Sequence, residues 1–158
     1  VEWLCWAGWK AVARKLVKGT LRSVQAIAAD PFLLYRRRGL PFQATVAVAQ
    51  VLGHELYGDE HYKAAVMEAL AQADEEGIGG LSDAHLVARC AELIGLPADR
   101  VAPSITLQAG RAGKCEQGLW FSPVVYFVRK KALAMIRANQ QDSGNASPSG
   151  QAREVRDR

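Results

Sequence analysis

The sequence is poor in cysteine, and the little it has forms no recognisable framework. Cys5, Cys90 and Cys115 are an odd number, and their spacing fits no zinc pattern, no CxxC redox pair and no disulfide set. We therefore expect a reducing, cytoplasmic environment. A chain of 158 residues with 49% hydrophobic residues is long enough to fold on an apolar core alone.

Long apolar runs are also absent. The longest nearly uncharged apolar stretch, residues 119–128, is about half of the roughly 20 residues that span a bilayer, and Pro123 interrupts it. The first residues carry an acid and three tryptophans, whereas a secretory signal needs a basic start and a clean apolar run. The sequence predicts neither a membrane span nor a signal peptide.

No catalytic constellation stands out. His54-Glu55 resembles the start of a zinc-protease helix, but position 58, where the second histidine belongs, is glycine. Cys115 lies in a basic loop without a histidine near it in sequence. We predict no catalytic residues and no cofactor, so the sequence favours a non-enzymatic function.

Charge is strongly segregated along the chain. Residues 1–38 hold eight bases and two acids, residues 39–110 three bases and ten acids, and residues 111–158 nine bases and four acids. Basic stretches beside tryptophans suit a polyanion or an anionic membrane surface, because bases meet phosphates and tryptophan favours the lipid interface. The predicted binding residues are Trp3, Trp6, Lys10, Arg14, Lys18, Arg36, Arg37, Arg38, Arg129 and Lys130.

Apolar periodicity predicts helices over residues 2–18, 20–29, 43–56, 62–73, 82–94 and 122–138, with a connector at 32–41. In 43–56, the β-branched Val46, Val48 and Val51 leave a strand as the alternative. The fold class is therefore mainly α, a single-domain bundle of about five or six helices over residues 1–139. A disordered tail is expected at 140–158, where little can be buried.

Local signals are clearest around the helix at 82–94. Ser82 is a good N-cap, and Gly95 followed by Pro97 is typical of a left-handed C-cap. Beyond it we expect a helical turn at 98–102, an extended segment at 104–108 and a Gly-rich basic loop at 109–118. In the last helix, five residues are expected to face the core: Val125, Val128, Ala132, Met135 and Ile136.

The acidic loop between two of these helices resembles a degenerate EF-hand. Asp74, Glu76 and Ser82 stand at ligand positions, but the fifth position is Ile78 and the twelfth, which needs a bidentate glutamate, is His85. Asp74, Glu76 and Ser82 are the metal candidates of the sequence, and no tight calcium site is predicted.

The same stretch, from Tyr62 to Val101, resembles the helix, acidic loop and helix of the tellurite-resistance TerB-like family. The motif ends in a Leu-Gly-Leu type of cap, present here around Gly95. The resemblance implies an all-helical fold and a non-enzymatic, stress- or membrane-associated adaptor.

A second pattern in this stretch is that of a helix-turn-helix. Ala91 and Gly95 have the spacing that lets two helices meet at a tight turn, Val101 would be buried, and Arg100 would reach phosphate. Two features oppose this reading. Pro103 falls within the proposed second helix, and the block is locally acidic.

The function that the sequence favours is a small helical adaptor that holds a protein partner on a charge-segregated surface. The alternatives are nucleic-acid binding through the basic ends, and peripheral association with an anionic membrane through the first helix.

Overall fold

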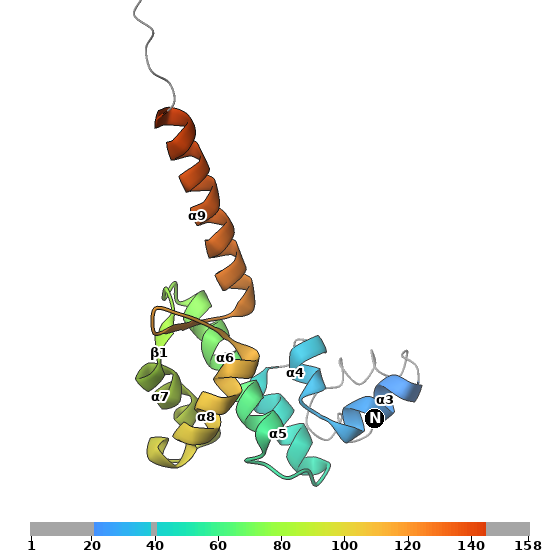
Figure 1. Ribbon diagram of the computed structural model, residues 1–158. Helices are drawn as coiled ribbons and strands as arrows, with labels where there is room; N and C mark the ends of the chain where they lie inside the picture. The colour runs from blue at the N-terminus through green and yellow to red at the C-terminus, as the bar shows by residue number, and fades with distance from the viewer. Residues whose placement is uncertain (1–20, 39–40, 145–158) are drawn as a thin grey trace, which may run out of the picture. The chain divides into compact units, whose positions relative to one another are not determined.

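The computed structural model describes residues 21–38 and 41–144; the helix predicted at 2–18 lies outside this range. The described part is mainly helical, as predicted, with seven helices and three short strands (Figure 1). The chain divides into two compact units, residues 1–123 and residues 124–158, and each is described by itself.

The first two helices of the described part are α3, Leu21–Ala29, and α4, Leu33–Arg38. The turn between them contains Pro31, and Asp30 Oδ1 accepts the backbone N–H of Phe32 at 3.1 Å. The segment 32–41 was predicted as a connector, with residues 32–35 either in the core or in an exposed patch, and the structure places its apolar residues in the core. Phe32 and Leu34 are both buried, because α4 turns the apolar side chains of this segment inward.

The next two helices are α5, Phe42–Val51, and α6, Asp59–Glu75. Helix, rather than strand, is confirmed for α5, which ends five residues earlier than predicted. In α6, Ala65, Val66, Ala69 and Leu70 are buried at helical spacing, which confirms the amphipathic pattern.

Helix α7, Asp83–Ile94, has the two ends that the sequence specifies. Ser82 Oγ accepts the backbone N–H of His85 at 3.3 Å, which satisfies one of the free donors of the first turn. Gly95 ends the helix at φ 78°, a left-handed conformation in which glycine avoids the Cβ clash, and its N–H donates to Ala91 O at 2.8 Å.

Helix α8, Ala98–Ala112, corrects two predictions at once. Residues 104–108 are helical rather than extended, and the helix continues through Pro103. Proline lies on the exposed side, while Val101, Ile105 and Ala109 are buried on the opposite side. Burial of this apolar face outweighs the backbone hydrogen bond that proline removes.

Three short strands, β1 (Leu81–Ser82), β2 (Lys114–Glu116) and β3 (Leu119–Phe121), form an antiparallel sheet in the order β1-β3-β2. The predicted loop at 109–118 is therefore wrong: it contains the end of α8, β2 and a tight turn. Gln117 at φ 53° and Gly118 at φ 74° make this two-residue turn, and Cys115 pairs with Trp120 across it.

The core of the first unit lies where α6, α7 and α8 pack against one another. Phe121 of β3 is buried and covers Gly80, where a Cβ atom would lie 2.8 Å from the Phe121 ring. The sheet is thus fixed against the helices by a close backbone approach that only glycine permits. Other buried members of the core include Leu81, Leu86, Cys90, Ile94, Val101 and Ile105.

Helix α9, Pro123–Gly144, belongs to the second unit from its second residue onward. It begins at the predicted Ser-Pro signal but extends six residues past the predicted end, so the expected tail starts inside the helix and residues 145–158 lie outside the described range. No residue of α9 is buried. The described residues of the second unit, taken by themselves, contain no core, so the prediction that Val125, Val128, Ala132, Met135 and Ile136 face one stays a prediction.

Candidate functional site

Helices α7 and α8 form a helix-turn-helix unit. The connection Gly95-Leu96-Pro97 has the length and the glycine of such turns, and both helices also pack on α6. Ala91 and Val101 are buried as this pattern predicts, and Arg100 is exposed. The objection from Pro103 does not hold, because the second helix forms around it.

The β2–β3 hairpin is held beside this unit by two contacts. β3 pairs with β1, which lies directly before α7, and the Trp120 indole N–H donates to Asp83 Oδ1 in the first turn of α7 at 2.5 Å. Along the chain, α6 is followed by β1, then by α7 and α8, and then by the β2–β3 hairpin.

One side of α8 carries exposed residues along its whole length. We call this the outer face of α8; it consists of Asp99, Arg100, Pro103, Thr106, Leu107, Gly110 and Arg111, which are all exposed and lie on one side of the helix. Leu107 is 54% exposed although it is apolar. Lys114 begins the hairpin and is exposed as well.

The outer face and the hairpin differ in charge from the stretch that directly precedes them. Residues 42–96 hold two bases and nine acids, whereas residues 97–123 hold three bases and two acids. One of the two bases in 42–96, Arg89, is already engaged: its guanidinium donates to both carboxylate oxygens of Glu76, at 3.2 and 2.6 Å. Among the described side chains of this unit, positive charge is thus gathered on α8 and β2.

Arg111 has one long contact with an acid. Its Nη1 lies 3.9 Å from Asp59 Oδ2, and both side chains are more than half exposed. An exposed pair at this distance contributes little to stability. The guanidinium can therefore exchange this carboxylate for a phosphate.

The binding residues predicted from the sequence fall into three groups along the chain. Trp3, Trp6, Lys10, Arg14 and Lys18 lie outside the described residues. Arg36, Arg37 and Arg38 are the last three residues of α4, and Arg129 and Lys130 lie in α9 of the second unit, with Lys130 Nζ 5.6 Å from the Tyr126 ring centre. A shared basic patch of the two ends stays a prediction.

The three metal candidates have other partners. Asp74 Oδ2 accepts the Ser122 hydroxyl at 2.6 Å, Glu76 binds Arg89, and Ser82 caps α7. Across residues 21–38 and 41–144, no group of three His, Cys, Asp or Glu side chains is placed to hold a metal ion.

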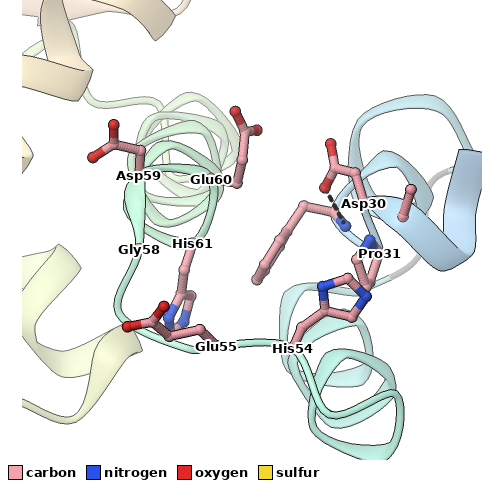
Figure 2. A pocket seen from close by; sticks show the side chains of 10 residues that line it. Asp30, Pro31, His54, Glu55, Gly58, Asp59, Glu60 and His61 are labelled. Atoms are coloured by element: carbon pink, nitrogen blue, oxygen red, sulfur yellow. Dashed lines mark hydrogen bonds between the residues drawn. The ribbon is translucent and has the colours of Figure 1, made fainter.

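A cavity of about 270 Å³ lies between the α3–α4 turn and the segment that leads from α5 into α6. Figure 2 shows its carboxylates, Asp30, Glu55, Asp59 and Glu60, around two histidines. His54 Nε2 is 2.6 Å from Ala28 O, and His61 Nδ1 accepts the Tyr57 N–H at 3.0 Å. His61 Nε2 has no partner but is shielded from solvent, so a molecule in the cavity cannot reach it.

Thiol chemistry is not supported at the buried cysteine. Burial raises the pKa of Cys90 to about 12, so the thiol stays protonated and unreactive at neutral pH. Cys115 is exposed on β2, with no histidine bonded to it among the described residues.

In the described residues, no helix has the length and apolarity needed to cross a membrane. No family model and no curated protein matches the sequence, and no solved structure matches the fold. The resemblance to the TerB-like family therefore stays a prediction.

Sequence reasoning missed two of the basic residues that the fold brings together. Arg111 and Lys114 were assigned to a loop, because the glycines at 110, 113 and 118 suggested irregular structure. The signal that points to them is the spacing of Arg100, Leu107 and Arg111, which places all three on one side of a helix once 98–112 is read as helical.

Proposed function

We propose that the protein binds duplex nucleic acid through the outer face of α8 and the adjoining hairpin. The observation that carries this is the group of three exposed bases, Arg100, Arg111 and Lys114, on the second helix and hairpin of a helix-turn-helix unit that follows the acidic stretch 42–96. In proteins that bind DNA with this motif, the second helix enters the major groove and the first crosses the backbone.

Phosphate contacts would supply the affinity. Each phosphate that a base neutralises releases counterions, so the logarithm of affinity falls with the logarithm of salt at a slope of about −0.9 per contact. Three contacts by these bases account for a loss of about 40-fold between 50 and 200 mM salt. Contacts by the basic ends of the chain would add to this slope.

The test is a salt titration of the full chain with a 24-base-pair DNA duplex, followed by fluorescence anisotropy of labelled DNA. The combined variant Arg100→Ala, Arg111→Ala and Lys114→Ala should make the slope shallower by about three. Lys63→Ala, which removes a base from α6, is the matched control and should leave the slope within about one contact of the wild type.

Two results would overturn the proposal in different ways. Absence of binding at 50 mM salt would end the nucleic-acid function. Binding whose slope is unchanged in the triple variant would move the interface from α8 to the basic ends.

A second function, that of a protein-binding adaptor, has one observation in its favour. Five large apolar side chains of α9 are more than half exposed: Val124, Phe127, Val128, Met135 and Ile136. Exposed apolar side chains in such number suit a protein interface. Its binding would change little with salt, so the same titration, with a protein partner in place of DNA, separates the two functions.

A further inference from the structure

We infer that the outer face of α8 reads the 5-methyl groups of thymine in the major groove of B-form DNA. This rests on the proposed function and names its substrate class. It follows from the chemistry of the centre of the outer face, which differs from the chemistry of its two ends.

The centre of the outer face is uncharged. Between Arg100 and Arg111 it presents Pro103, Thr106, Leu107 and Gly110. Leu107 is the large side chain among them and remains 54% exposed, while the apolar residues on the other side of the helix are buried. The centre therefore offers an apolar contact surface rather than a polar one.

Hydrogen-bond donors are also missing from these four side chains. Proline, leucine and glycine have none, and the Thr106 hydroxyl donates within the helix to Ala102 O at 2.9 Å. What Thr106 has left to offer outward is its methyl group and an acceptor oxygen. The bidentate contacts that specify guanine or adenine need Arg, Lys, Asn or Gln at such positions.

The major groove contains one apolar group, and it belongs to thymine. Leucine and the threonine methyl can bury the thymine C5-methyl, an apolar group that G·C pairs do not present in the major groove. Contact with Leu107 and Thr106 thus favours sites that contain A·T pairs.

The ends of the outer face fit the walls of the same groove. Arg100 and Arg111 are separated by about 16 Å along the helix axis, somewhat more than the ~12 Å width of the major groove of B-DNA. Two cations at that separation complement phosphates on the two strands that border the groove, while the exposed carboxylate of Asp99 lies at the Arg100 end of the same face. This charge complementarity favours DNA over a protein as the partner that covers Leu107.

Duplex RNA is a poor partner for the same surface. The major groove of A-form RNA is too deep and narrow for side chains to read, and uracil lacks the methyl group. The inference therefore distinguishes B-form DNA from RNA at two levels, groove shape and base chemistry.

The experiment compares two DNA duplexes that differ only in that methyl group. Both are 24 base pairs of alternating A·T sequence, one with thymine and one with deoxyuridine throughout, titrated with the full chain at 100 mM salt. Loss of the methyl groups should weaken binding about four-fold for each methyl that is contacted. Leu107→Ala should bring the ratio of the two affinities close to one.

Ile78→Ala is the matched control. It truncates another apolar side chain of the same unit, 37% exposed, in the loop between α6 and β1. This variant should keep the wild-type preference for thymine. Circular dichroism of both variants checks that each remains folded.

The outcomes separate this inference from the proposed function. Equal binding of the two duplexes, with the salt slope still dependent on Arg100, Arg111 and Lys114, would overturn the thymine reading and leave duplex binding in place. Equal loss of affinity for both duplexes in Leu107→Ala would overturn the inference too, because Leu107 would then contribute to binding without contacting the methyl groups. Absence of binding to either duplex would end both.

Discussion

The buried His61 packs against the rings of Phe32 and Phe42 and also lines the cavity that contains several carboxylates. His61 is 2% exposed, and its ring lies 5.5 Å from that of Phe32 and 5.8 Å from that of Phe42, measured between ring centres. Burial lowers the pKa of His61 below its ordinary value of 6.5. The carboxylates of Glu55, Asp59 and Glu60 line the neighbouring cavity.

The lowered pKa predicts that stability falls as the pH drops below 6.5. In this range the unfolded chain binds a proton on His61 and the folded chain does not, so each pH unit costs at most about 1.4 kcal/mol until the folded pKa is reached. Urea unfolding at pH 7 and pH 5 measures this loss. His61→Phe, which keeps an aromatic ring in the cluster, should reduce the pH dependence even though the Tyr57 N–H loses its acceptor.

His85→Gln provides the comparison, because His85 is exposed at the start of α7. If His61→Phe and the wild type lose stability in parallel between pH 7 and pH 5, the proton uptake belongs to another group.

At single residues, sequence signals succeeded where the chemistry is local. Ser82 and Gly95 were placed correctly because a cap needs only the few residues around it. The sequence alone does not place Phe32, because its burial depends on a distant partner: its ring stacks on His61, twenty-nine positions further along the chain. No pattern within residues 32–41 contains that contact.

At the scale of elements, α8 and the hairpin show why glycine and proline led to wrong predictions of secondary structure. Pro103 and the glycines at 110 and 113 argued against a helix that forms nevertheless, since Val101, Ile105 and Ala109 fill the space against α6 and α7. The strands β2 and β3 have three residues each, too few for an alternating pattern to be read.

The hairpin turn gives a prediction that belongs to this scale. Gln117 at φ 53° and Gly118 at φ 74° both have the positive φ that a type I′ turn requires, and asparagine adopts it more readily than glutamine. Gln117→Asn should therefore stabilise the protein by about 0.5 kcal/mol, measured as a rise in the urea midpoint at constant slope.

Gln117→Val is the opposite variant at the same position. A β-branched residue with positive φ is strained, so it should destabilise by more than about 1 kcal/mol. Equal midpoints for the Asn and Val variants would mean that the turn does not hold this conformation in solution.

At the scale of the molecule, the segregation of charge was visible in the sequence, but its position in space was not. The acidic middle contains the helix-turn-helix, and counting charge over residues 39–110 hid the fact that Arg100 faces the same side of α8 as Arg111. A count of charges along a stretch of sequence adds up all sides of a helix. The field that a partner meets depends on one face.

We expect Asp59 to lower the affinity of the outer face of α8 for phosphate, because its carboxylate contacts Arg111. Asp59→Asn should free the guanidinium for phosphate and raise the affinity for duplex DNA at 100 mM salt by about two- to five-fold, the effect of about 0.4–1 kcal/mol from an exposed pair. Glu55→Gln removes the same charge from an exposed position outside the outer face of α8 and serves as control.

Because Asp59 also lies in the first turn of α6, its replacement should cost about 0.5 kcal/mol of stability, which urea unfolding reports separately. A gain that is equal in the two variants would reflect net charge alone, and no gain in Asp59→Asn would remove Arg111 from the interface.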